Sequence, residues 1–271
     1  MALEIISATT IENCRRIEYL QEKIWGGPAS DIVPDHMLLT FAKNGGVVLI
    51  AVRDGQDVGF AYGFLGKTAD GQLKHCSHQA GVLPGSQNSG VGYRLKLAQR
   101  AAVLAQGIEL ITWTFDPLQS RNAYFNMRKL GAVSNTYFRE LYGVMRDGLN
   151  AGLPSDRLEV AWRLNSEPVR RRLAGDFPPP KIDSARVLNP CTLDGRGFPL
   201  PPDRTQSPVE NRHFLQIPPD INAIKSADMP LAIAWRAHTR QLFEQAFVRG
   251  YTLTDFVFSR GENAAFYVLE K

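Results

Sequence analysis

The sequence has few cysteines and no long apolar run, and each absence narrows the class of protein. Its three cysteines, Cys14, Cys76 and Cys191, lie far apart and show no spacing typical of metal ligands. They suit a reducing compartment better than a disulfide framework, so we expect a cytoplasmic protein. No apolar run approaches the length of a membrane span, and glutamates interrupt residues 1–25 where a signal peptide would be apolar. We therefore expect no membrane partner.

An excess of charge of one sign is also missing. The formal net charge is +4, which is mildly basic and suits an enzyme that attracts a polyanionic cofactor. Nucleic-acid binding would require a basic stripe with interleaved aromatic residues. The one dense basic cluster, residues 170–172, lies beside proline and acidic residues and is interpreted as a solvated segment. We therefore expect no nucleic-acid partner.

The stretch from His78 to Gln106 predicts a strand, a tight loop and a helix. The strand ends at Pro84, because proline cannot donate a ladder hydrogen bond. Residues 85–92 are small or polar and form the loop. The helix follows from apolar or small residues spaced by fours and threes, and Gly107 ends it. These spaced residues are Val91, Leu95, Ala98, Ala102 and Ala105.

The loop is the candidate for binding chemistry. The first turn of a helix has unpaired N–H groups and a positive potential, and Gly90 and Gly92 would let a bulky anion approach the backbone. A diphosphate fits such a site best. A dinucleotide fingerprint would need glycine instead of Leu95, and the Gly-Lys-Ser/Thr of a P-loop is missing. The alternative is a turn that uses glycine only for backbone freedom.

A family resemblance rests on this loop. Val82-x-Pro84 followed by Gln87-x-x-Gly90-x-Gly92 and an amphipathic helix resembles the acyl-CoA signature of the GNAT superfamily of N-acyltransferases. The resemblance implies that acetyl-CoA or another acyl-CoA is the co-substrate, with the loop amides holding its pyrophosphate and the preceding strand pairing with its pantetheine arm. The residues implied in cofactor binding are Val82, Gln87, Asn88, Ser89, Gly90, Val91, Gly92 and Asn122.

The elements around the loop are predicted in the order of a GNAT core. A strand at 3–7 precedes helices at 9–25 and 35–43 and strands at 47–53, 58–65 and 73–83. A strand at 109–115, a helix at 117–129 and strands at 132–142 and 158–164 follow the loop and its helix. Residues 122–132 resemble the family's second signature, a helix that closes in Lys-Leu-Gly. With residues 113–118 (WTFDPL), they also resemble a narrower GNAT-like group.

These elements predict an α/β fold with a GNAT-like mixed central sheet flanked by helices and a smaller C-terminal α+β extension. We expect an acyl-CoA-binding domain at 1–165 and a proline-rich linker at 166–210 that holds one strand at 185–188. The extension at 211–271 would contain strands at 213–217, 251–258 and 265–269 and a helix at 231–248. It would pack onto the core or mediate contacts in a homodimer.

The expected chemistry is direct attack of an amine on a thioester, without a metal. The family's usual proton donor is a tyrosine two residues before the lysine of Lys-Leu-Gly, and here that residue is Met127, which cannot donate. Tyr124 lies one turn earlier and is the substitute candidate, with a structural tyrosine as the alternative. His78 is the candidate general base, with a core or edge histidine as the alternative. His75 should point to the opposite face.

Two residues are candidates for acceptor binding. Asn126 could hydrogen-bond the substrate or pantetheine, or stabilise helix packing. Arg157, beside Asp156, could clamp a carboxylate, or the two could form a surface ion pair. The predicted function is transfer of an acetyl or other short acyl group to a small amine such as an amino acid or metabolite. The alternatives are a catalytically silent CoA-binding sensor or partner subunit, which Met127 favours, and a plain structural α/β domain.

Overall fold

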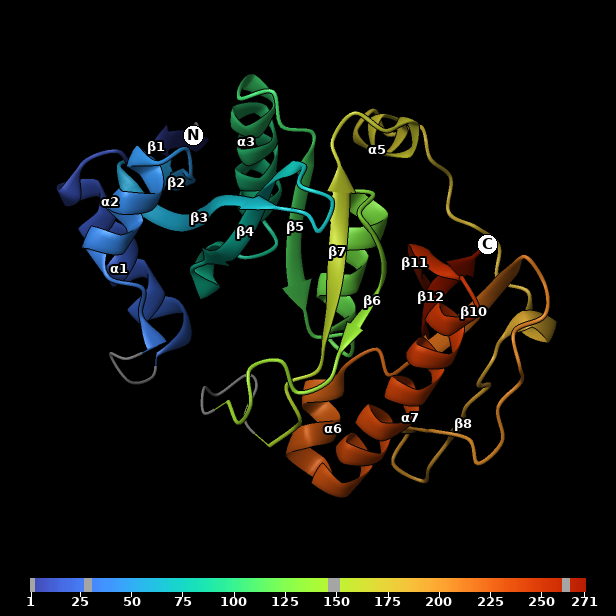
Figure 1. Ribbon diagram of the computed structural model, residues 1–271. Coiled ribbons are helices and arrows are strands. Elements are labelled where there is room, and N and C mark those ends of the chain that lie inside the picture. The colour runs from blue at the N-terminus through green and yellow to red at the C-terminus, as the bar shows by residue number, and fades with distance from the viewer. Residues whose placement is uncertain (1–2, 27–30, 146–151, 260–263) are drawn as a thin grey trace. The chain divides into compact units, whose positions relative to one another are not determined.

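The computed structural model describes residues 3–26, 31–145, 152–259 and 264–271. The chain divides into two compact units. The described part of the first unit ends at Trp113, and that of the second comprises Thr114–Met145 and residues 152–259 and 264–271. In Figure 1 the first unit runs from blue to green, and most of the second runs from green to red.

The first unit follows the predicted order of elements. This order is β1 (Leu3–Ser7), α1 (Ile11–Trp25), α2 (Asp35–Lys43), β2 (Val47–Arg53), β3 (Gln56–Lys67), β4 (Leu73–Val82) and α3 (Val91–Ala105). β1 to β4 pair antiparallel in sequence order, and β5 (Leu110–Phe115) pairs parallel with β4 through residues 111 and 112. The prediction of a mixed sheet is therefore confirmed.

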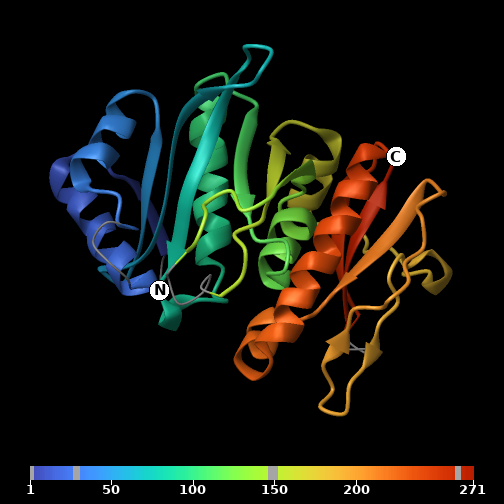
Figure 2. The same cartoon turned by 60° about the horizontal axis from the view of Figure 1, so that its bottom comes forward.

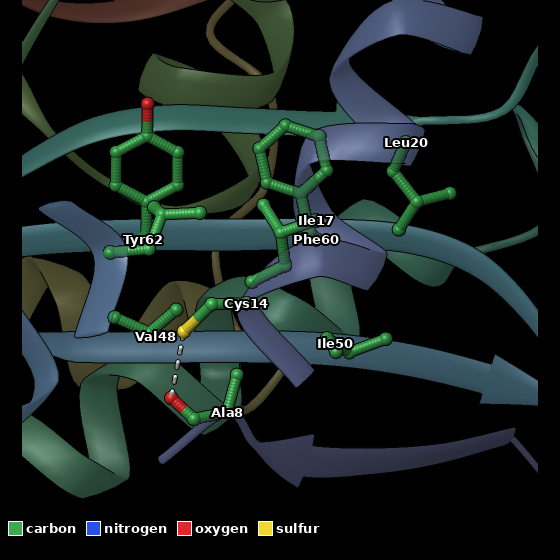
Figure 3. Close-up of a cluster of buried hydrophobic side chains, with 9 residues drawn as sticks. Ala8, Cys14, Ile17, Leu20, Val48, Ile50, Phe60 and Tyr62 are labelled. Carbon is green, nitrogen blue, oxygen red and sulfur yellow. Dashed lines mark hydrogen bonds between the residues drawn. The ribbon is translucent and has the colours of Figure 1, made fainter. Parts of the chain in front are cut away.

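Helices cover both faces of this sheet because its strands are apolar on both sides. On one face, residues of α1 pack with alternate residues of β2 and β3, as Figure 3 shows. The cluster contains Cys14, Ile17, Leu20, Val48, Ile50, Phe60 and Tyr62. On the other face, a Cβ added at Gly59 would lie 3.3 Å from Val91 of α3. Figure 2 shows α1 and α2 in blue on one side of the strands and α3 in green on the other.

The strands of the second unit pair antiparallel in the order β7-β6-β11-β12-β10. The strands are β6 (Val133–Phe138), β7 (Arg157–Arg163), β10 (Arg212–Ile217), β11 (Thr252–Ser259) and β12 (Ala264–Glu270). Its long helix is α7 (Met229–Val248), preceded by α6 (Ile221–Ala227), which was not predicted. The three strands and the helix predicted in residues 211–271 are confirmed to within two residues.

The C-terminal segment packs onto β6, the strand that follows residues 122–132. Leu253 of β11 pairs with Ser134 of β6, which joins the two parts of the unit in one sheet. Tyr267 of β12 is buried and donates a hydrogen bond to the backbone oxygen of Pro117 (2.8 Å). The Arg236 guanidinium on α7 is buried and donates to both carboxylate oxygens of Asp116 (2.7 Å each).

The predicted helix 117–129 begins later than expected and changes type. Asp116 accepts from the N–H of Leu118 through its side chain and from that of Gln119 through its backbone, so a turn precedes the helix. The α-helical part, α4, spans Ser120–Ala123 and continues as a π-helix over Tyr124–Lys129. Within it the N–H of Leu130 bonds the carbonyl of Phe125, five residues back.

Residues 166–210 contain more structure than the linker that the sequence predicted. They include α5 (Glu167–Leu173) and a short hairpin of β8 (Thr192–Leu193) and β9 (Pro199–Leu200). The strand predicted at 185–188 is wrong. A 3-10 turn at Ser184–Arg186 takes its place, followed by a single bridge from Val187 to Phe214.

Two kinds of feature are absent from the described residues. Among them, no helix is both long enough and apolar enough to cross a membrane. In the same ranges no group of three or more histidine, cysteine, aspartate or glutamate side chains is placed to hold a metal ion.

Candidate functional site

The loop between β4 and α3 has the strand-loop-helix form that the sequence predicted. β4 ends at Val82, a 3-10 turn spans Pro84–Ser86, and α3 begins at Val91. Gly90 is the N-cap of α3 with φ 84°, a left-handed conformation that glycine adopts without strain. Asn88 is also left-handed (φ 60°), which asparagine tolerates better than most residues. The chain thereby turns sharply into the helix.

The first turn of α3 follows an exposed loop and has unpaired donors. Within the described ranges, the N–H groups of Val91, Gly92 and Tyr93 bond no acceptor of the chain, and the first helical bond there runs from Arg94 to the carbonyl of Gly90 (3.0 Å). Gln87, Asn88, Ser89 and Gly90 are all exposed. The helix dipole adds positive potential at this end, so the loop favours an anion.

A guanidinium adds positive charge beside the loop. Arg53 at the end of β2 donates to the hydroxyl of Ser89 (3.1 Å), and Ser89 donates to the carbonyl of Ser86 (2.6 Å). Gln87 turns back and donates to the carbonyl of Val82 (3.4 Å), which closes the loop against the strand. Arginine and a helix N-terminus together match the charge of a phosphate group.

Gly92 leaves space that the chain itself does not fill. An added Cβ there would meet only a methyl group of Val82, at 3.8 Å, which is an ordinary contact. A Cβ at Gly90 would meet nothing within 4 Å. Glycine at 92 is therefore not required by packing within the chain. The space in front of the backbone at Gly92 is therefore open.

His78 lies on β4 at a β-bulge. The register with β3 pairs Tyr62 with Gln79 and Gly63 with Ser77, which leaves His78 as the extra residue. Its side chain is exposed and its ring lies 5.7 Å from that of Tyr62 and 6.0 Å from that of Phe64. Desolvation lowers the pKa of His78, so it is mainly neutral at pH 7 and can accept a proton.

His75 points to the opposite face of β4, as predicted, and belongs to a buried polar network that the sequence did not reveal. Lys96 of α3 donates to the hydroxyl of Ser77 (2.8 Å) and to the amide oxygen of Gln99 (3.0 Å), and the Gln99 amide lies 3.2 Å from His75 Nε2. The Lys96 ammonium also lies 3.9 Å from the ring centroid of Trp113. No carboxylate takes part in these contacts.

The network disfavours the charged forms of its two basic groups. Burial lowers the pKa of Lys96 to about 7. Burial, together with the charge of Lys96, lowers the pKa of His75 to about 4. Gly63 makes room for the imidazole, because a Cβ there would lie 2.5 Å from His75 Nε2. The sequence predicted an apolar face on α3 and did not identify Lys96 and Gln99 as buried. It did contain a signal, because Lys96 and Gln99 are three residues apart on the helix, and His75 and Ser77 alternate on β4.

The remaining predicted site residues lie in the second unit. Asn122 is exposed on α4. The ring of Tyr124 lies 5.4 Å from that of Phe258 on β11. Asn126 is buried, and its backbone carbonyl accepts from the N–H of Ala132 (3.0 Å), close to the end of the π-helix. Met127 is fully buried, so the residue at the family's tyrosine position packs in the core.

Asp156 and Arg157 do not pair with each other through their side chains. Asp156 is buried and accepts two hydrogen bonds from Arg240 of α7 (2.7 Å each), one from Tyr137 (2.6 Å) and one from the N–H of Glu140 (3.0 Å). Arg157 is buried as well and donates to the backbone oxygen of Asp156 (2.9 Å). The carboxylate is therefore occupied within the unit.

Comparison with known proteins gives matches in structure alone. No family model matches the sequence, and no curated protein matches it either. Solved structures are similar in fold at 12–16% identity. The ribosomal-protein alanine N-acetyltransferase of Escherichia coli matches over 61% of this chain and 96% of its own at 16% identity, with a TM-score of 0.45. A GNAT-family acetyltransferase of Streptococcus pneumoniae matches over 59% and 98% at 12% identity, with a TM-score of 0.47.

An aminoglycoside 6'-acetyltransferase type Ii matches over 62% of this chain and 99% of its own at 15% identity, with a TM-score of 0.47. Similarity at this level does not by itself say what the chain binds or which reaction it catalyses. Those questions depend on the residues of the loop and the strands beside it.

Proposed function

We propose that the chain binds an acyl-CoA at the turn between β4 and α3 and transfers its acyl group to the nitrogen of a small amine. The observation that carries the proposal is the exposed N-terminus of α3, where three N–H groups have no acceptor in the described chain and Gly92 leaves open space. Arg53 supplies further positive charge at the same turn. The motif's resemblance to the acyl-CoA signature of GNAT enzymes supports the same ligand.

The acyl-CoA supplies the thioester carbonyl, and the chain supplies binding and proton transfer. The loop amides hold the diphosphate, and the β4 backbone near Val82 orients the acyl arm. His78, mainly neutral at pH 7, takes a proton from the attacking amine. Tyr124 gives a proton to the departing thiolate, and Asn122 contributes to cofactor binding. Asn126 and Arg157 serve acceptor binding, with Arg157 attracting the acceptor's carboxylate.

A second candidate function is a binding protein that holds acyl-CoA without turning it over. Met127 favours it, because this buried thioether stands where the resemblance places a proton-donating tyrosine. The binding site is the same in both cases. Chemistry alone separates the two functions.

Calorimetric titration with acetyl-CoA tests the binding site. Gly92→Val should weaken binding at least about tenfold, because the new side chain fills the space in front of the amides. Gly85→Val is the matched control, since a Cβ at Gly85 meets nothing within 4 Å and this residue lies in the preceding 3-10 turn. Equal affinities for the two variants would overturn the assignment of the site.

Release of free thiol tests the chemistry. We expect thiol release from acetyl-CoA or succinyl-CoA in the presence of at least one amine of a panel of amino acids and small metabolites. Binding of acetyl-CoA without thiol release with any amine would select the silent binding protein.

A further inference from the structure

A cavity of about 900 Å³ lies within the second unit. Sites for small molecules typically occupy roughly 300–1,000 Å³, so its size suits a ligand rather than a few waters. α4 and the π-helix provide one wall, and β11 provides another. Residues 179 and 219 complete the lining with prolines. The chain segments that form it are separated by up to about half of the sequence, and the predicted binding motif contributes none of them.

Positive charge dominates the lining. Arg121, Arg128 and Lys129 face a single carboxylate, that of Asp220. Asp220 is already used, because it caps α6 by accepting from the N–H groups of Asn222 (3.0 Å) and Ala223 (3.1 Å).

Arg128 is also engaged, whereas the other two cations are not. It pairs with the buried Asp255 (2.8 Å) and donates to the backbone oxygens of Phe177 and Pro178, so it fastens the 177–180 segment to the wall. Arg121 and Lys129 are exposed and have no carboxylate partner among the described residues. The cavity therefore has two positive charges that nothing in the described chain neutralises.

The π-helix places one of these charges beside an aromatic ring. In a π-helix residues five apart lie on one side, and Tyr124 and Lys129 have this spacing. The Lys129 ammonium accordingly lies 6.0 Å from the Tyr124 ring centroid. In an α-helix the side chain of Lys129 would instead point away from that of Tyr124, by more than a third of a revolution about the helix axis. Helical widening of this kind is frequent at functional sites.

Flat apolar surface adjoins the charges. The rings of Tyr124 and Phe258 lie 5.4 Å apart at 42°, and both side chains are half-buried in the cavity lining. Phe258 is itself held by Phe256, at 5.3 Å. Partly exposed aromatic faces next to unpaired cations are suited to a ligand with an aromatic body and an anionic group.

We propose that this cavity is a binding site for a small anion that carries a flat apolar group, such as an aryl phosphate or aryl carboxylate. The anionic group lies between Arg121 and Lys129, and the flat group packs against Tyr124 and Phe258. The site is formed by residues of the second unit. It shares Tyr124 with the proposed acyl transfer, which uses the phenol O–H, whereas this site uses the face of the ring.

Phenyl phosphate is the probe for the test, measured by calorimetry with the full chain. We expect saturable binding with a Kd of about 1 mM or lower. Inorganic phosphate lacks the ring and benzyl alcohol lacks the charge, so each should bind at least about tenfold more weakly. Arg121→Gln and Lys129→Gln should each weaken phenyl phosphate binding about tenfold, the usual loss on removal of one charge-assisted contact.

Matched variants separate the site from general surface charge. Arg249→Gln removes an exposed arginine at the end of α7 and should leave the Kd unchanged. Phe258→Leu should weaken phenyl phosphate but not inorganic phosphate, and circular dichroism should show that each variant is folded. Equal losses for Arg249→Gln and Arg121→Gln, or no saturable binding to the wild type, would overturn the proposal.

Saturating CoA distinguishes a free aryl anion from the phosphates of the cofactor. We expect phenyl phosphate to bind with the same Kd in its presence. Displacement by CoA, together with weaker CoA binding by Arg121→Gln, would assign the cavity to the cofactor and overturn the proposal of a separate site. Retention of phenyl phosphate binding in a chain that fails to bind CoA would leave this inference intact and refute the proposed function instead.

Discussion

Replacing Lys96 by methionine should change how the stability of the protein depends on pH. The amine lies in the buried network between β4 and α3, where its hydrogen bonds go to a hydroxyl and an amide oxygen and it pairs with no carboxylate of the described residues. A neutral amine has two N–H donors, which these two acceptors satisfy. An ammonium has a third N–H, which would face the ring of Trp113. Burial therefore favours the neutral form.

The size of the stability change follows from the pKa of Lys96 in the unfolded chain and in the folded chain. Burial lowers the pKa of Lys96 from 10.5 to about 7, so the unfolded chain binds one more proton than the folded chain between these values. The free energy of unfolding therefore rises with pH across this window, at up to about 1.4 kcal/mol per pH unit. Between pH 7 and 9 the increase that Lys96 contributes is about 2 kcal/mol, and above pH 10.5 it ends.

Urea unfolding of wild type and Lys96→Met at several pH values between 7 and 9 measures the effect. Other titrating groups are common to both proteins, so the difference between their free energies of unfolding isolates Lys96. We expect the variant to lose stability relative to the wild type by about 2 kcal/mol as the pH rises from 7 to 9. Lys67→Met, at the exposed end of β3, is the control for removal of a lysine. A difference that stays constant with pH would show that Lys96 is charged in the folded protein.

Three further predictions concern catalysis and the second unit. Tyr124→Phe should lower thiol release at least about tenfold with acetyl-CoA affinity unchanged, and an unchanged rate would refute its role as proton donor. His78→Gln should lower thiol release at neutral pH. Because its surroundings lower the pKa of His78, the wild-type rate should persist below pH 6.5 before it falls, and a fall centred above pH 6.5 would contradict this. Asp156→Asn should reduce the free energy of unfolding by about 3 kcal/mol in urea, because it removes the charge of the buried carboxylate that pairs with Arg240; a loss below about 1 kcal/mol would contradict it.

The pH dependence of that last interaction has the same sign as that of Lys96, because the pKa of each group is lower in the folded chain, but it falls in the acid range. Burial acts to raise the pKa of Asp156, but the hydrogen bonds from Arg240 and Tyr137 outweigh it and lower the pKa below 3.8. The stability that Asp156 contributes is thus present above pH 3.8 and is lost only as the pH falls through the lower value. The free energies of unfolding of the wild type and of Asp156→Asn should therefore converge at low pH.

The order of elements could be predicted because local signals specify it. Alternating or helical apolar spacing identified the strands and helices, and Pro84 and Gly107 marked the ends of two of them. The turn at Gly90 was predictable for the same reason, since a left-handed residue before a helix favours glycine. These signals act over a few residues and need no knowledge of the tertiary fold.

The features that the sequence did not reveal depend on distant contacts. Lys96 and Gln99 replace apolar residues on a buried face, and only their partners on β4 explain why they are tolerated there. The cavity of the second unit draws on α4 and β11, which are more than one hundred residues apart. The late start of α4 was missed because the helix was expected to begin at residue 117, whereas the side chain of Asp116 stabilises a turn there.

The π-helix at Tyr124–Lys129 accommodates one residue more per turn than its neighbour α4, which makes the register of this wall sensitive to chain length. Deleting one residue there would let an ordinary helix re-form at little cost in backbone bonding. Every side chain on one flank would then shift by about 100° against the other. A relative of this chain that lacks that residue should therefore keep the fold and present a different surface at Lys129. Insertion or deletion of a residue would then change this wall more than substitution does.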